Sequence, residues 1–208
     1  MINRFMYPDL PIADVYVVTP TLGESKKLVR SLRSVEAQDY SGTIVHLVIG
    51  DAVGDSIASN AQALCKKHRA YFINDTRIVE TRYAPARTGR LRNYGADIAN
   101  AAYVAHLDDD NQFKTNHISS LVKILETHKD IDIAFSWRHF VDAEGNPIAL
   151  QRYPWVLGHR PELAREVFLK LCELGVFTAG SSLIRDPEPS EEDDLLHVDS
   201  SEWVMRKK

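Results

Sequence analysis

Short apolar runs alternate with amphipathic segments through the first half of the chain. The apolar runs are rich in β-branched and aromatic residues and end in proline, glycine or polar residues, which predicts buried strands at 15–21, 43–51 and 70–74. The amphipathic segments repeat apolar residues every three or four positions, which predicts helices at 24–38 and 55–68. Strands and helices that alternate at these lengths indicate parallel βαβ units.

The alternation resumes after an irregular segment. Residues 75–89 show no clear period and contain a proline and a glycine, so we predict a long loop, and loops of this length often carry function. A helix is predicted at 90–101, a strand at 102–110 and another helix at 116–128. Ser25 is the expected N-cap of the first helix in the series.

The second half of the chain has a different pattern. Residues 131–153 are strand-like on both sides of the segment 143–146, "AEGN", which predicts a hairpin. A helix at 161–175 and a strand at 177–185 follow, and then an acidic segment that is expected to be a solvated loop. We therefore predict an α/β fold with a Rossmann-like, mostly parallel sheet flanked by helices and a mixed or antiparallel C-terminal part.

Composition restricts the class of protein. The length of 208 residues suits one domain, and the net charge of -4 lacks the positive excess of a nucleic-acid-binding protein. No signal peptide is evident and no apolar run approaches the length of a membrane span, so we expect a cytoplasmic protein, with peripheral membrane contact left open. Cys65 and Cys172 fall in amphipathic segments and are expected to be buried free thiols, with a disulfide as the alternative; free thiols are a weak indication of a reducing compartment.

Polar side chains follow each predicted parallel strand. Parallel sheets bind their ligands beyond the carboxyl ends of the strands, so these residues are the first candidates for a site. They are Thr19 to Thr21, Asp51, Asn74 with Asp75, and Asp108 to Asp110.

Three interpretations are open for the run of aspartates from Asp108 to Asp110. The first is a solvated strand end that leads into a helix. The second, an EF-hand calcium loop, requires glycine and glutamate where this chain has Phe113 and Ser119, which argues against it. The third is a divalent-cation site that also holds phosphates. Two carboxylates separated by one residue on a strand, as Asp108 and Asp110 are, can point to the same side, and hard cations prefer oxygen ligands.

The order of motifs resembles the family 2 glycosyltransferases, which have the GT-A fold. The chain has "VYVVTPTLGESKKLVRSLRSVEAQ", then a strand that ends in "VIGD", then "RLRNYGADIANAAYVAHLDDDNQF". The resemblance covers about residues 14–113 well and extends more loosely to about residue 204. It implies a single GT-A domain over 1–208, in which 14–113 bind a nucleotide sugar and 114–208 form the acceptor side. Relatives often continue further, so an incomplete acceptor side is one expectation.

The resemblance also implies which residues contact the nucleotide. Asp51 resembles the aspartate that hydrogen-bonds the base, with a simple turn aspartate as the alternative. Arg92 and Asn93, together with Gly95, match the Arg-Asn-x-Gly element near the nucleotide, and a guanidinium at a helix start suits phosphate on chemical grounds. Contacts to the base or ribose, mainly through backbone groups, are implied for Thr19, Pro20 and Thr21.

The aspartate run matches the DxD motif of the family. Asp110 is the expected ligand of Mn²⁺ or Mg²⁺, and Asp108 is expected to lie nearer the ribose while sharing the metal. We include Asp109 in the predicted nucleotide-sugar site as an additional acid, whose own role is expected to be structural or outward-facing.

An inverting transfer also needs a base that deprotonates the acceptor hydroxyl. In the family this base lies late, in an acidic motif before a helix that carries an aromatic residue, and "HVDSSEW" offers Asp199. The family motif more often has two adjacent acids, whereas His197 and Val198 precede Asp199 here. The alternative role for Asp199 is a helix N-cap in a capping box completed by Glu202.

Three further side chains have alternative roles. His106 is expected to be a hydrogen-bonded core histidine rather than a metal ligand. Trp137 and Trp155 could each stack on a sugar ring, but core packing is the commoner use of tryptophan.

We therefore expect a metal-dependent, inverting glycosyltransferase that uses a nucleotide-diphosphate sugar, with UDP as the expected nucleotide and an unknown sugar, lipid or protein acceptor. A sugar-1-phosphate nucleotidyltransferase is one alternative, although such enzymes have a glycine-rich loop where "TPTLGESKK" has one glycine. A non-catalytic nucleotide- or glycan-binding domain of the same fold is the other.

Overall fold

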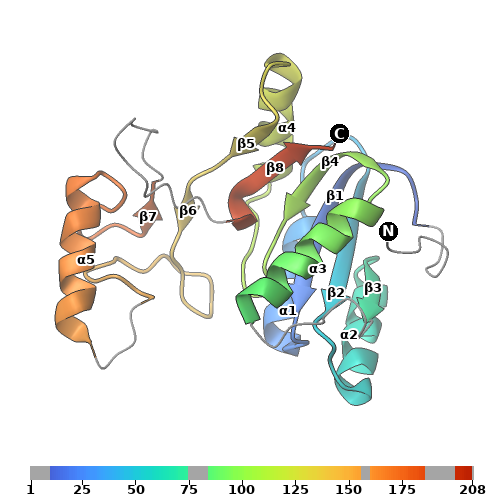
Figure 1. Cartoon of the computed structure of the whole chain (residues 1–208), viewed down its shortest axis with the longest axis horizontal. Helices are drawn as coiled ribbons and strands as arrows, with labels where there is room; N and C mark the ends of the chain where they lie inside the picture. Colours follow the sequence, from blue (N-terminus) through green and yellow to red (C-terminus); the bar gives the residue numbers. More distant parts are fainter. Residues whose placement is uncertain (1–9, 75–83, 156–159, 186–199, 208) are drawn as a thin grey trace. The chain divides into compact units, whose positions relative to one another are not determined.

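The computed structural model describes residues 10–74, 84–155, 160–185 and 200–207. Contacts within the chain divide it into two compact units. The larger unit contains the described residues up to Phe135 together with 200–207, and the smaller unit begins at Ser136 (Figure 1). The predicted organisation as one domain stays a prediction.

A six-stranded sheet forms the centre of the larger unit, in the order β3-β2-β1-β4-β8-β5. The strands β3, β2, β1 and β4 pair with one another in parallel, whereas β8 pairs antiparallel with both β4 and β5. The strands are β1 (Ala13–Thr21), β2 (Ile44–Gly50), β3 (Tyr71–Asn74), β4 (Ala101–His106), β5 (Ile133–Phe135) and β8 (Trp203–Arg206). This arrangement confirms the predicted α/β fold with a mostly parallel sheet.

Helices cover both faces of this sheet. They are α1 (Ser25–Glu36), α2 (Asp55–Lys67), α3 (Ala84–Ile98) and α4 (His117–Thr127). The alternation of side chains along β1 assigns the faces: Val15 and Val17 pack in one core with α4, whereas Tyr16 and Val18 pack in another with α3. In Figure 1, α3 lies in front of the strands and α1 behind them.

Two predicted details of these helices are wrong. Ser25 is the first residue of α1, and Glu24 occupies the N-cap position without a side-chain cap hydrogen bond. The predicted loop 75–89 is helical from Ala84 onward, since α3 begins there, while 75–83 lie outside the described residues. Pro85 is compatible with the first turn of a helix, because the N–H that it lacks has no partner within the helix at that position.

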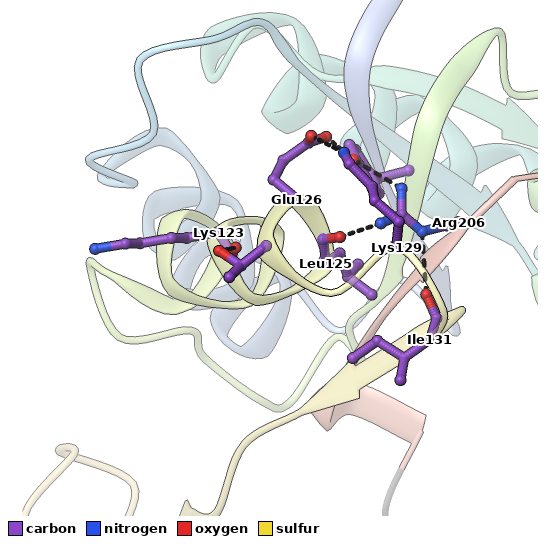
Figure 2. A network of polar contacts seen from close by, with 8 residues as sticks. Lys123, Leu125, Glu126, Lys129, Ile131 and Arg206 are labelled. Atoms are coloured by element: carbon purple, nitrogen blue, oxygen red, sulfur yellow. Dashed lines mark hydrogen bonds and ion pairs between the residues drawn. The ribbon is translucent and has the colours of Figure 1, made fainter.

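The last strand, β8, was not predicted, and basic residues at its end attach it to two helices. Figure 2 shows Arg206, whose guanidinium donates to the carbonyls of Leu125 at the end of α4 and of Ile131, the latter at 3.1 Å. Lys207 donates to the carbonyls of Asp97, at 3.0 Å, and Ala99 at the end of α3. Positive charge at helix C-termini is favourable, so β8 is held on both faces of the sheet.

The smaller unit contains α5 (Pro161–Glu173) and a two-stranded sheet of β6 (Arg138–His139) and β7 (Leu183–Ile184). Its core is formed by Leu150, Phe168, Phe177 and Ile184. The predicted turn is present, because the Asp142 amide donates to the Asn146 carbonyl at 2.9 Å and Val141 forms an isolated antiparallel bridge with Pro147. The strand expected after this turn is not formed in residues 147–153. The strand predicted at 177–185 is reduced to β7.

The predictions for the tryptophans and cysteines are only partly correct. Trp137 and Trp155 are each about half exposed, so core packing is wrong for both, and sugar stacking stays a prediction. Trp155 makes edge contacts with two neighbouring aromatic rings, and an arginine lies over each indole: Arg138 over Trp155 and Arg185 over Trp137. Both cysteines are free, but only Cys65 is fully buried.

Candidate functional site

The predicted site residues of β1, β2 and β4 come together at one edge of the sheet. Thr21 lies opposite Gly50 in the parallel register, and the Leu107 amide donates to the Val18 carbonyl at 3.1 Å. The residues that follow β2 and β4 are therefore neighbours of the end of β1. This edge carries Thr19 to Thr21, Asp51 and Asp108 to Asp110.

The threonines of β1 use their side chains within the protein. Thr19 is fully buried, and its hydroxyl lies 2.8 Å from Nε2 of His46. Burial lowers the pKa of His46 to about 3, so this histidine is neutral at physiological pH. The Thr21 hydroxyl donates to Oδ2 of Asp109 at 2.5 Å and accepts the Gly23 amide at 2.8 Å. Both side chains are engaged within the protein, and contact of this strand with a nucleotide through its backbone stays a prediction.

Asp51, directly after β2, forms an ion pair with Arg87 of α3. The Arg87 guanidinium reaches Oδ1 of Asp51 with Nη2 at 2.7 Å and Nε at 2.9 Å, and Nη2 also donates to the Asp51 carbonyl at 3.1 Å. Sequence reasoning missed this role of Arg87, because it assigned the residue to a loop. The available signal was the gathering of arginines between positions 77 and 92 of the sequence.

A second arginine of α3 pairs with the aspartate run. Nη2 of Arg92 donates to Oδ1 of Asp108, and the Arg92 side chain is largely buried. The Asp108 amide donates to the hydroxyl of Ser201 at 3.1 Å, and Asn111 donates to the same hydroxyl at 3.2 Å. Ser201 was not predicted, because only the pairing of β8 with β4 brings it to this edge.

The two other residues of the Arg-Asn-x-Gly element lie differently. Asn93 is exposed. A Cβ atom on Gly95 would lie 2.4 Å from Cγ1 of Val18 and 3.0 Å from Cδ1 of Ile49. The close approach of α3 to the sheet therefore explains this glycine without a nucleotide.

Asp109 and Asp110 have contrasting environments. Burial, with smaller contributions from Asp110 and Asp108, raises the pKa of Asp109, although the hydrogen bonds from Thr21 and the Leu22 amide oppose that shift. Asp109 is partly buried and bonded to Thr21, which is what its predicted structural role requires, and its place in the nucleotide-sugar site stays a prediction. Asp110 is exposed and is the aspartate best placed to meet a ligand from solvent.

The carboxylates at this edge fit a divalent cation only together with a ligand. Within the part of the chain that the structure describes, no three His, Cys, Asp or Glu side chains form a metal-binding group by themselves. Mg²⁺ and similar hard cations, however, are commonly bound by one or two carboxylates together with substrate phosphates. Asp108 and Asp110 supply carboxylates of this kind, so the residues fit a metal that arrives with a diphosphate.

The proposed base, Asp199, lies outside the described residues. The helix expected after it is reduced to a short 3-10 helix (Ser200–Glu202), and β8 begins at once with the aromatic residue Trp203. Glu202 in that turn is buried, with 3% of its surface exposed. His106 is also buried, and its pKa is lowered to about 4, mainly by burial and to a lesser extent by Arg92. Its burial fits the predicted core histidine, but its Nδ1 has no hydrogen-bond partner among the described residues, so the predicted hydrogen bond is not found at that atom.

Comparison with known proteins identifies the family. The sequence matches the family model described as glycosyl transferase family 2 over residues 16–186. The chain belongs to this family. The prediction of a glycosyltransferase is thereby confirmed at the level of family membership.

This family 2 glycosyltransferase is similar to an uncharacterized glycosyltransferase of Methanocaldococcus jannaschii. The two are 28% identical over 140 residues, which cover 66% of this chain and 45% of the relative. The chain thus spans less than half the length of the curated relative.

Two solved structures resemble this family 2 glycosyltransferase. Glucosyl-3-phosphoglycerate synthase from Mycobacterium tuberculosis, solved with phosphoglyceric acid, matches with a TM-score of 0.52 and 17% identity over 94% of this chain and 57% of that chain. This likeness confirms the GT-A fold. A mannosyltransferase from Pyrobaculum calidifontis, solved with GDP-Man and Mn²⁺, is 20% identical with a TM-score of 0.48, over 62% of this chain and 39% of that chain. No helix among the described residues is long and apolar enough to cross a membrane.

Proposed function

We propose that this chain binds a nucleotide-diphosphate sugar at the carboxyl edge of its parallel sheet and transfers the sugar, with inversion, to an acceptor. UDP is the proposed nucleotide. The observation that carries the proposal is the convergence at one edge of Asp51, which follows β2, of Arg92 in α3, and of the run from Asp108 to Asp110, which follows β4. Acids and guanidinium groups gathered there match the two components of a metal-bound diphosphate.

Asp110 and Asp108 are the proposed ligands of Mn²⁺ or Mg²⁺. A divalent ion bound there would supply positive charge that stabilises the departing diphosphate. Asp108 already pairs with Arg92, so cationic charge stands at this position in the protein itself. We propose that Arg92 also contacts a phosphate, because a guanidinium offers several donors beyond the one that Asp108 accepts.

Asp199 is proposed as the base that takes the proton from the acceptor hydroxyl during its attack on the anomeric carbon. Two residues later, the hydroxyl of Ser201 accepts a hydrogen bond from the Asp108 amide and so connects the start of the described segment 200–207 to the aspartate run. That tie supports a location of the segment near the donor site. The cytoplasmic location and any peripheral membrane contact also stay predictions.

Calorimetric titration of UDP tests the donor site. UDP should bind the wild type in the presence of Mn²⁺, and both omission of the metal and Asp110→Asn should weaken binding by about tenfold or more. Absence of binding by UDP, GDP and other nucleoside diphosphates would overturn the proposal.

The catalytic step needs its own test. Once a donor sugar is found, Asp199→Asn should abolish turnover and leave UDP affinity nearly unchanged. Full turnover in that variant would exclude Asp199 as the base. Binding without turnover by the wild type, for every donor and acceptor tried, would favour a non-catalytic nucleotide-binding domain.

A further inference from the structure

Asp51 has one carboxylate oxygen occupied and one available. Oδ1 accepts a hydrogen bond from Nε of Arg87 and forms an ion pair with Nη2 of the same guanidinium. Among the described residues, no group donates a hydrogen bond to Oδ2. The Asp51 side chain is only 13% exposed, so this remaining acceptor is largely buried and lies next to a guanidinium.

The backbone around Asp51 is fixed on both sides. The Asp51 amide donates to the Thr21 carbonyl at 2.9 Å. Asn74, at the end of β3, accepts the Val53 amide at 3.1 Å and donates to the Val53 carbonyl at 2.9 Å. Asp51 therefore cannot turn to offer both oxygens to a ligand without losing the Arg87 contacts.

We propose that Arg87 determines the base specificity of the nucleotide site, by leaving Asp51 a single acceptor beside a guanidinium, and that the preferred base is uracil. This inference rests on the proposed function, in which Asp51 binds the base. It assigns a specificity role to a residue of α3 that lies outside the recognised motifs.

The chemistry of the bases supports this choice. Uracil presents one ring N–H between two carbonyls, so its N–H can donate to Oδ2 of Asp51 while a carbonyl faces the Arg87 guanidinium. Guanine presents a ring N–H and an amino group side by side, and a carboxylate satisfies both only when both of its oxygens are free. With Oδ1 occupied, the guanine amino group would meet the guanidinium instead of an acceptor. A buried polar group without a partner costs enough binding energy to reject a ligand.

Adenine and cytosine fit less well than uracil. Each lacks the ring N–H beside a carbonyl and offers an exocyclic amino group instead. That group would reach Oδ2 only with the ring displaced from the position that uracil takes. We therefore expect UDP to bind most tightly, and GDP, ADP and CDP to bind with lower affinity.

The test is calorimetric titration of UDP, GDP, ADP and CDP, each with Mn²⁺, into the wild type and Arg87→Gln. The wild type should prefer UDP over GDP by about tenfold or more. Arg87→Gln should weaken UDP binding and reduce the ratio of UDP to GDP affinity by about tenfold, because Asp51 regains its second acceptor. Arg87→Lys should lie between the two, since it keeps the charge but loses the planar fork.

Arg33→Gln is the matched control, because Arg33 is an exposed arginine in the last turn of α1. It should retain the affinity and the selectivity of the wild type, and circular dichroism should show all variants folded. An unchanged ratio in Arg87→Gln, or tighter UDP binding in Arg87→Gln, would each overturn the inference while the proposed function stands. A wild-type preference for GDP would overturn the inference and the choice of UDP, and would leave only the proposed nucleotide-diphosphate-sugar site. Failure of every nucleotide to bind the wild type would instead remove the proposed function, and this inference with it.

Discussion

The hydroxyl of Thr21 donates to the carboxylate of Asp109 at 2.5 Å and so joins two turns that lie 88 residues apart in the sequence. Thr21 ends β1, and Asp109 lies in the middle of the aspartate run after β4. The bond explains how an additional acid is accommodated between two acids that are expected to hold a metal. It also makes the position of the loop after β1 depend on the turn after β4.

Replacing Thr21 by valine should therefore disturb both turns. Thr21→Val keeps the shape of the side chain but leaves the Asp109 carboxylate with one hydrogen bond fewer, which should lower the free energy of unfolding by about 1–3 kcal/mol. UDP affinity should fall as well. Thr127→Val removes a hydroxyl that bonds only an exposed helix carbonyl and should have little effect. Equal effects of the two substitutions in denaturant titrations would contradict the importance of the Thr21 bond.

Gly95 and Gly89 of α3 should respond in opposite ways to alanine. The added Cβ at Gly95 would meet the buried side chains of Val18 and Ile49, so Gly95→Ala should destabilise the protein by about 1–3 kcal/mol. Nothing lies within 4 Å of a Cβ at Gly89, so Gly89→Ala should stabilise the helix by about 0.5–1 kcal/mol. Thermal unfolding of the two variants would measure both signs, and stabilisation by Gly95→Ala would show that the helix is not so closely packed.

Arg206 should be essential for stability. Arg206→Met removes the donors to the Leu125 and Ile131 carbonyls, and it also removes the 3.3 Å contact with the Tyr103 hydroxyl. We expect a loss of about 2–4 kcal/mol in the free energy of unfolding, because these acceptors are left without their charged partner. Lys129→Met is the control: its ion pair with Glu126 lies on the exposed side of the same network (Figure 2), and its loss should be undetectable. A loss of similar size in the control would mean that the network, rather than Arg206, is responsible.

Buried histidines should make the protein sensitive to acid. Burial lowers the pKa of His46 to about 3 and that of His117 to about 4, whereas an unfolded histidine titrates near 6.5. Below pH 6.5 the unfolded state therefore binds protons that the folded state does not, so stability falls as the pH drops from 6.5 toward 3 to 4. At pH 5 the loss for one such histidine is about 2 kcal/mol.

His46→Gln tests this sign, because glutamine can keep a hydrogen bond to Thr19 and does not titrate. The free energy of unfolding of this variant should fall less than that of the wild type between pH 7 and pH 5. His128→Gln, which replaces an exposed histidine, should follow the wild type. Parallel curves for His46→Gln and the wild type would show that His46 does not carry this acid sensitivity.

Local patterns of the sequence predicted most of the larger unit. The β-branched runs and the spacing of apolar residues predicted β1 to β4 and the helices α1, α2 and α4 to within a few residues. The rule that parallel sheets bind ligands at their carboxyl ends then placed Asp51 and the aspartate run at a common edge. These inferences succeeded because side-chain periodicity reflects burial directly.

Contacts between distant segments could not be derived in the same way. The pairing of Asp51 with Arg87 depends on the start of α3, which no periodicity indicated. The position of Ser201 beside Asp108 depends on β8, a four-residue strand whose pairing is held by Arg206 and Lys207. Short strands and ion pairs gain their stability from partners far away in the sequence, so a local window contains no signal for them.

The sequence by itself thus determined the fold class, the family and the edge of the sheet at which the chemistry is expected. Only the tertiary structure decided which side chains at that edge are already engaged: Thr19 with His46, Thr21 with Asp109, Asp51 with Arg87 and Asp108 with Arg92. The physical reason is that residue type and spacing define what a side chain can bind, whereas the partner that it does bind depends on which distant segments the fold brings within hydrogen-bond distance.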